Sequence, residues 1–396
     1  MSPDRQTRNF WLLAAAGALV TLLGLAAAHR MEEHGHVITG MDNQVVWGLP
    51  HVFAIFMIVA ASGVLNVASV GSVFGQAVYK RRAPLSGLLS LALLAGGLMV
   101  LMLDLGRPDR VLVAATHYNF SSMFALNVFL YSGLAAVVVV YLWTMFERRF
   151  NPWSKPAGVA VMVWRFVLTT GTGAIFAFLV ARQAYQSALL PPLFVVLSFA
   201  WGLAVFLVVQ AALLAWNGRR PAPEVDRRLA RLLAVFVLLS VYFVAVLHLT
   251  NLYYARQGAF EAFILLGRGG GEVFALLFWG GFVVLGSLLP CALLLAPRAG
   301  APRATLAASL LVVLGAFAFL YVFIIGGQAF PLEIFPGWTA TSSFADGQVA
   351  HYVPSWPELG LGLGGLGAAF LLTIVGVHVL DFMPSDDAPG VADARA

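Results

Sequence analysis

Charged residues gather at the end of an apolar segment, in the stretch LMLDLGRPDR that runs from position 101 to 110. Asp104 closes the apolar run, and Arg107 follows three residues later in a Gly-Arg-Pro corner. A carboxylate in such a place can accept and release a proton, and a neighbouring guanidinium can keep it ionised or bind a ligand oxygen. These residue types predict a proton-handling site at Asp104. The alternative is a structural salt bridge with Arg107 that fixes the turn.

Five other polar residues lie inside or at the edge of apolar segments, namely His51, Asn127, His248, Asn251 and Glu272. If these segments cross a membrane, the five residues and Asp104 reach a similar depth and could line one cavity. Ionisable residues inside membrane spans are costly, so their presence favours a function. The simpler alternatives are a histidine bonded to a carbonyl, an asparagine that joins two helices, and a glutamate that favours the positive N-terminus of its own helix.

A deeper polar group is predicted from Arg165, in VMVWRFVLTTGTG, together with Thr169 and with Asn66 of an earlier segment. A buried arginine with hydroxyl and amide neighbours suggests a hydrated path for protons. The alternative is an arginine whose side chain extends to the membrane surface. The residues predicted for a proton path are Asn66, Arg165, Thr169, His248, Asn251 and Glu272.

Long apolar segments position all of these residues. The chain has 396 residues, of which 61% are hydrophobic and 10% charged, whereas soluble domains carry about a quarter charged residues. Ten segments reach roughly the 20 residues that cross ~30 Å of hydrocarbon. They are predicted at 10–29, 46–74, 85–106, 122–146, 157–182, 191–216, 230–254, 272–297, 303–327 and 357–381. The sequence therefore predicts an all-α integral membrane protein that forms a single polytopic domain over 1–396.

Lys and Arg gather in alternate connecting segments, such as KRR (80–82) and the arginine-rich stretch 219–231. Cytoplasmic loops carry this excess, so both termini are predicted to be cytoplasmic. Asp104 then lies near the outer face and Arg165 nearer the inner face. The first apolar segment is predicted to be a retained helix, because no small-residue cleavage site precedes HRMEEHGH.

The cofactors that this protein could hold are limited by its cysteine and histidine residues. A single cysteine, Cys291, can form neither an internal disulfide nor a Cys-ligated iron–sulfur cluster. A bis-histidine haem needs two facing intramembrane histidines, and His51 and His248 are far apart in the sequence. Neither haem nor a metal site is expected, and a b-type cytochrome stays as an alternative. A quinone suits the polar residues better, because its head group needs hydrogen-bond partners and a proton donor or acceptor.

Four motifs resemble the NrfD/PsrC family, the quinone-interacting membrane subunits of bacterial respiratory complexes. They are VVWGLPHVFAIF, the corner DLGRPDR, HYNFSSMFALN and YVPSWPEL, and they lie in family order between about 46 and 381. The resemblance implies two four-helix bundles, formed by helices 2–5 (46–182) and helices 6–9 (191–327). Helices 1 and 10, in 1–45 and 328–396, would flank them.

The resemblance also implies a site for menaquinone or ubiquinone near the periplasmic face, and no haem or iron–sulfur cluster in this protein. Electrons would pass through a periplasmic ferredoxin-like iron–sulfur subunit. Asp104 and His51 are the predicted catalytic pair, with Arg107 holding Asp104 ionised or binding a quinone carbonyl oxygen. The residues predicted to contact the quinone are His51, Asp104, Arg107, His117, Asn119 and Asn127.

Within the family, HGHVITGMDNQVVWGLPHVFAIF is most similar to the P subunits of Dsr complexes, the membrane redox assemblies linked to dissimilatory sulfite reductase. This similarity implies sulfur metabolism, further membrane and cytochrome subunits, lipid contacts, and a place in the bacterial cytoplasmic membrane. Outer segments such as ATHYNFSS and FPGWTATSSFADGQVAHYVPSWPEL are predicted to be covered by a partner, or else to form interfacial aromatic belts. No nucleic-acid partner is expected. An inert membrane anchor and an ion or solute transporter are the other functional alternatives.

Overall fold

Among the residues that the structure describes, ten helical segments are long and apolar enough to cross a membrane. The computed structural model describes residues 3–217, 223–296, 301–332, 347–380 and 382, and its regular structure within these ranges is helical throughout. The spans are α1 (Pro3–His34), α2 (Leu49–Ser72), α4 (Ala83–Leu103), α6 (Met123–Phe146), α7 (Ser154–Ala177), α8 (Leu190–Trp216), α9 (Pro223–Tyr253), α11–η5–α12 (Glu272–Leu276, Leu277–Leu288, Leu289–Leu295), α13–η6–α14 (Pro302–Leu320, Tyr321–Gly326, Gly327–Ala329) and α15 (Trp356–Val379). The predicted all-α membrane fold is confirmed.

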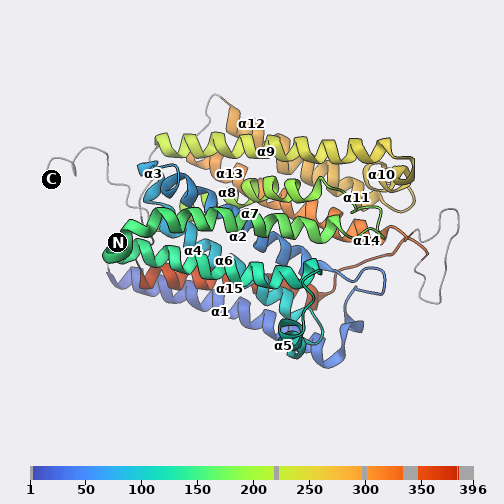
Figure 1. Ribbon diagram of the computed structural model, residues 1–396, viewed down its shortest axis with the longest axis horizontal. Helices are drawn as coiled ribbons and strands as arrows, with labels where there is room; N and C mark the ends of the chain where they lie inside the picture. The colour runs from blue at the N-terminus through green and yellow to red at the C-terminus, as the bar shows by residue number, and fades with distance from the viewer. Residues whose placement is uncertain (1–2, 218–222, 297–300, 333–346, 381, 383–396) are drawn as a thin grey trace.

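Short helical elements connect the spans. They are η1 (His36–Ile38), α3 (Ala77–Lys80), η2 (Pro108–Arg110), α5 (Val111–Thr116), η3 (Arg148–Trp153), η4 (Ala255–Gln257) and α10 (Gly258–Leu266). Figure 1 shows the long helices lying side by side, with α3 at one end of the molecule and α5, α10 and α14 toward the other. We call the end with α5 and α10 the outer end, and the end with α3 the arginine-rich end.

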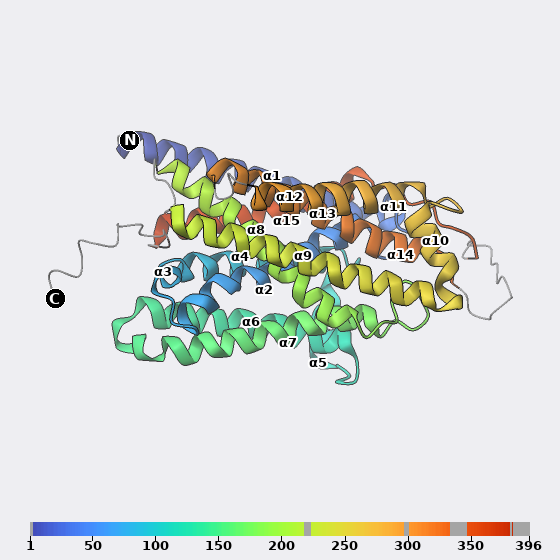
Figure 2. The ribbon, with the colours of Figure 1, turned by 90° about the horizontal axis from the view of Figure 1, so that it is seen from above.

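The spans form two bundles and a flanking pair. In the first bundle each helix packs on the next around a ring, α2 on α4, α4 on α6, α6 on α7, and α7 back on α2. The second bundle closes in the same way through α8, α9, α12 with η5, and α13. Helix α15 packs on α4 and α2, and α1 packs mainly on α15. Figure 2 shows α2 between the α6–α7 pair and α13.

Helix α2 lies at the centre because it is apolar around its whole circumference. Its most apolar window is entirely buried, as expected of a helix without a polar face. It meets α8 of the second bundle at Gly63 and Gly202, where a Cβ on either glycine would overlap the other helix's backbone. Small residues at crossings let membrane helices approach closely, so this glycine pair joins the two bundles.

Side-chain amides fix the segment that leads into α2. The Gln44 side chain donates to the backbone oxygens of Gln328 and Ala329, and the Gln328 side-chain oxygen accepts from the backbone N–H of Trp47. Arg182 donates to the backbone oxygens of Gln328 and Gln44. The start of α2 is therefore tied to the end of the second bundle. The outer segment 333–346, predicted to form part of a partner surface, lies outside the described residues.

Candidate functional site

Asp104 and His51 meet at the outer end of the first bundle. Asp104 is the C-cap of α4 and is 7% exposed, while His51 lies in the first turn of α2. His51 Nδ1 is 2.7 Å from Asp104 Oδ2. The distance is that of an ion pair, but the angles do not form an aligned hydrogen bond, so neither carboxylate oxygen has an aligned donor among the described residues. Because buried polar groups are nearly always satisfied, this carboxylate has unused capacity for a ligand or a proton.

His36, which the sequence did not predict as a site residue, flanks Asp104 on the other side. Its Nε2 lies 3.1 Å from the Asp104 backbone oxygen and 3.9 Å from Asp104 Oδ1. Gly106 adopts a φ of 69°, which favours glycine, and a Cβ there would come within 3.1 Å of the His36 ring. The glycine of the corner therefore makes room for this histidine. Its signal in the sequence was the HGH motif, but nothing local pointed to Asp104, 68 residues away.

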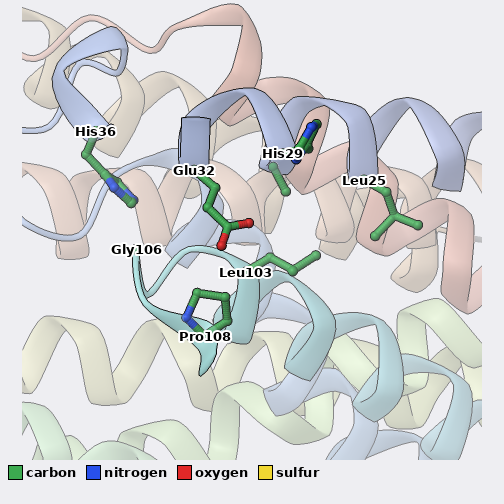
Figure 3. Close-up of a pocket in the computed structure, with 8 residues that line it drawn as sticks. Leu25, His29, Glu32, His36, Leu103, Gly106 and Pro108 are labelled. Atoms are coloured by element: carbon green, nitrogen blue, oxygen red, sulfur yellow. The ribbon is translucent and has the colours of Figure 1, made fainter. Parts of the chain in front are cut away.

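A cavity of about 130 Å³ opens beside His36. It is lined by Leu25, Ala28, His29, Glu32, His36, Leu103, Gly106 and Pro108. Figure 3 shows the Glu32 carboxylate pointing from α1 toward the Gly106–Pro108 corner, with the His36 ring beside it. His36 thus belongs both to the cavity wall and to the environment of Asp104. Three titratable side chains therefore lie in succession behind the cavity wall: His36, then Asp104 at 3.9 Å, then His51 at 2.7 Å from the carboxylate.

Arg107 does not pair with Asp104, and that expectation is wrong. Its guanidinium donates to Asp109 through Nε at 3.1 Å and through Nη2 at 3.0 Å, in an exposed pair. The left-handed turn at Gly106 reverses the chain after Asp104 and carries Arg107 outward. The hydrogen bond from Arg107 lowers the pKa of Asp109.

Aromatic rings close the other side of His51. The Trp47 ring stacks on the His51 ring with centroids 5.8 Å apart, and it also contacts Phe124 of α6 and Phe176 of α7. The Trp47 ring therefore links the His51 imidazole to aromatic rings of α6 and α7. Trp47 was not among the predicted site residues.

Three residues predicted to contact the quinone, in α6 or just before it, do not line the cavity: His117, Asn119 and Asn127. His117 and Asn119 are exposed and make local contacts, His117 with Thr116 and Asn119 with the Ser121 backbone. Asn127 is buried, and its side-chain nitrogen donates to the backbone oxygens of Met123 and Gly171. This geometry matches the alternative in which Asn127 joins two helices.

A second buried cluster lies in the second bundle, around Glu261, which the sequence did not single out. His248 Nδ1 is 2.7 Å from one Glu261 carboxylate oxygen, and the Asn251 side chain donates to the other at 2.7 Å. Glu261 lies in α10 and is fully buried. Glu272, the predicted neighbour, is exposed at the start of α11. A cavity of about 20 Å³ beside His248 and Asn251 is large enough for one water molecule.

The six polar residues predicted at one depth therefore do not line one cavity. They separate into a cluster at Asp104 in the first bundle and a cluster at Glu261 in the second. Each of the two histidines considered as haem ligands is engaged by a different carboxylate, His51 by Asp104 and His248 by Glu261. The two histidines thus lie in different bundles, His51 in α2 and His248 in α9.

The deep group around Arg165 forms as predicted between α2 and α7. The Arg165 guanidinium donates to the Asn66 side chain and to the Ser62 backbone oxygen, and Thr169 donates to the Arg165 backbone oxygen at 2.7 Å. Arg165 is 4% exposed, so the alternative of a side chain that reaches the surface is wrong. Among the described residues no carboxylate lies within ion-pair distance of Arg165.

In the part of the chain that the structure describes, ten membrane-spanning helices in two closed bundles with a flanking pair define a multi-pass integral membrane protein. The family model described as "Polysulphide reductase, NrfD" matches residues 37–332, and the chain belongs to this family.

Several known proteins are similar to this one over most of its length. An Hdr-like menaquinol oxidoreductase integral membrane subunit of Archaeoglobus fulgidus is 29% identical, over 95% of this sequence and 94% of that protein. A putative dimethyl sulfoxide reductase membrane subunit of Halobacterium salinarum is 27% identical, over 92% and 89%. A polysulfide reductase chain of Wolinella succinogenes is 26% identical, over 73% of this sequence and 96% of that protein.

Proposed function

We propose that this protein is the quinone-interacting membrane subunit of a respiratory redox complex. The observation that carries the proposal is the buried Asp104 carboxylate, which lies between His36 and His51 and has no aligned hydrogen-bond donor among the described residues. The name of one relative supports a quinol substrate, since that protein is a menaquinol oxidoreductase subunit. The substrate is accordingly a menaquinol-type or ubiquinol-type molecule.

The side chains supply the proton chemistry of this reaction. Oxidation of a quinol releases two electrons and two protons, and quinone reduction takes up the same number. His36 at the cavity wall accepts a proton from the quinol hydroxyl or returns it, and Asp104 and His51 pass it on. The series therefore couples electron transfer at the cavity to proton movement at the outer end of the first bundle.

The electrons need a partner, because a single cysteine cannot hold an iron–sulfur cluster. A ferredoxin-like iron–sulfur subunit on the outer face would receive or deliver them, within a complex that holds further membrane and cytochrome subunits. The relative from a polysulfide reductase supports a role in sulfur metabolism, and we propose a complex of the Dsr type, to which the segment HGHVITGMDNQVVWGLPHVFAIF is similar.

A proton path across the first bundle is part of the proposal. Its members are Asn66, Arg165 and Thr169, which already form one hydrogen-bonded group. In the second bundle His248 and Asn251 act with Glu261, while Glu272 would provide an exposed acidic group at the outer end.

Replacing Asp104 by Asn tests the proposal, because the amide keeps the shape of the carboxylate but cannot take up a proton. We expect quinol-linked electron transfer by the purified complex to fall by roughly a hundredfold or more, the usual contribution of a general base, while the complex still assembles. Asp109→Asn is the matched control, since Asp109 pairs with Arg107 at the surface. Normal turnover in Asp104→Asn would contradict the proposal and would mean that Asp104 has a structural role only.

Two measurements on the intact complex separate this function from its alternatives. Organic extraction that recovers a quinone supports the proposal, and its absence from an active complex favours an inert anchor. A haem band in the reduced-minus-oxidised spectrum of this subunit alone would favour the b-type cytochrome.

A further inference from the structure

A groove opens at the arginine-rich end of the second bundle, at the opposite end of the helices from Asp104. Its volume is about 490 Å³, well above that of the cavity at His36. Its lining comes from three helices and includes Leu207, Ala211, Ala215, Asp226, Arg303 and Thr305. The groove therefore lies between the last turns of α8 and the first turns of α9 and α13.

One wall of the groove is an apolar stripe on α8. Leu207, Ala211, Leu214 and Ala215 recur with the spacing of one helix face. The two leucines are buried, and the accessible residues of the stripe are Ala211 and Ala215. From Leu207 to Ala215 the stripe is about 12 Å long at 1.5 Å per residue. The two alanines keep the wall shallow, so the groove accepts a slender apolar chain laid along α8.

The opposite wall carries polar groups from the first turn of α13. Thr305 is 3% exposed, and its hydroxyl has no hydrogen-bond partner among the described residues. Threonines elsewhere in the spans, such as Thr169, donate to the carbonyl four residues before. A buried hydroxyl without a partner costs free energy, so an acceptor brought to Thr305 by a ligand in the groove would stabilise it.

Charges at the groove favour an anionic head group. Arg303 is exposed at the groove, and its guanidinium matches the geometry of a phosphate. The carbonyl-type oxygen of the Gln210 side chain already accepts from Arg82 at 2.9 Å. Asp226 also lines the groove but is buried and has a partner of its own, so Arg303 and Thr305 are the groups that face an incoming anion.

We propose that this groove binds one phosphate-headed membrane lipid of the arginine-rich leaflet. The phosphate lies against the Arg303 guanidinium and the Thr305 hydroxyl, and one acyl or alkyl chain lies along the α8 stripe. A free anion would leave the apolar stripe unused, and an uncharged alkyl chain would leave the Thr305 hydroxyl unsatisfied. The site is independent of the quinone chemistry proposed at the outer end.

The test is lipid counting by native mass spectrometry on the purified, delipidated complex, titrated with dioleoyl phosphatidylglycerol. We expect one tightly bound lipid per copy of this protein. Ala211→Phe fills the groove and should weaken that binding by about tenfold or more, the factor for ~1.4 kcal/mol. Thr305→Val, which replaces the hydroxyl by a methyl of the same size, and Arg303→Gln should each weaken it several-fold.

The matched control is Ala212→Phe, because Ala212 is the next residue on α8 and is exposed on another face. It should leave lipid binding unchanged. If Ala211→Phe disturbs assembly, Thr305→Val and Arg303→Gln carry the test. Equal lipid counts in the wild-type protein and the groove variants would overturn the proposal. If inorganic phosphate displaced the lipid at the lipid's own concentration, the groove would be a simple anion site, and the proposal would also be wrong.

Discussion

Two aspartates five residues apart have opposite environments in this protein. Asp109 is exposed, and Arg107 holds its charge through two hydrogen bonds. Asp104 is buried, with a histidine on each side and no aligned donor among the described residues. A buried carboxylate without fixed donors is a poor structural element but a suitable proton acceptor. The difference between the two residues argues for chemistry at Asp104 rather than for a structural corner.

Arg165 is a buried cation, and its role could likewise be structural or chemical. Its guanidinium is buried, contacts Asn66 and lies 4.8 Å from the Phe166 ring, with no carboxylate partner in the part of the chain that the structure describes. If it belongs to the proton path, Arg165→Gln should abolish proton uptake linked to quinol turnover and leave electron transfer within a few-fold of wild type. Proteoliposomes with an internal pH dye measure the uptake. The control is Arg231→Gln, because Arg231 is an exposed arginine of α9. Unchanged proton uptake in Arg165→Gln would show that Arg165 is not part of a proton path.

Residues within apolar segments could be predicted from the sequence, but their partners in connecting segments could not. Asp104 and His51 were paired correctly because each lies at the outer edge of a span. His36 and Glu261 were missed because they lie in connections, and no periodicity relates them to the spans that they face. Arg107 was assigned to the wrong aspartate because the left-handed turn at Gly106 reverses the chain between them.

At the scale of elements, the crossing of α2 and α8 fixes the relation between the two bundles. Helix α2 carries His51 near its start and Asn66 toward its other end, and it packs on α4, α7 and α8. Apolar length and composition predicted most of the spans to within five residues of their observed bounds, but α1 and α9 each begin seven residues before the predicted start. The crossing point was not predictable, because many glycines lie in the spans and the sequence does not indicate which of them meet.

Gly63→Ala tests that crossing. The added methyl would overlap the Ser198 carbonyl group of α8, so the helices must separate. We expect a loss of about 1–3 kcal/mol in stability, the usual cost of overpacking, visible as a lower thermal unfolding midpoint in detergent. Gly280→Ala is the control, because the nearest atom to its added methyl is the Leu276 side chain at 3.7 Å. Equal midpoints for the two variants would contradict the close crossing.

The whole molecule has its proposed quinone chemistry at one end and its proposed lipid site at the other. Helix α1 begins and α15 ends at the arginine-rich end (Figure 1), which the positive-inside rule assigns to the cytoplasm. A green fluorescent protein fused to the C-terminus should therefore fluoresce, and an alkaline phosphatase fused there should be inactive. The opposite result would invert the orientation and place the Asp104 cluster on the cytoplasmic side.

The contact between α1 and α15 has a consequence for biosynthesis. At Gly24 and Gly364 the two helices touch so closely that neither could carry a side chain, and α1 has little other packing. Since α1 precedes α15 in the sequence, it lacks its main packing partner until α15 has been inserted. Because α1 supplies Glu32 to the cavity beside His36, a chain interrupted before α15 has no properly supported cavity. Packing of α15 on α1 is therefore expected to complete the cavity proposed for the quinone.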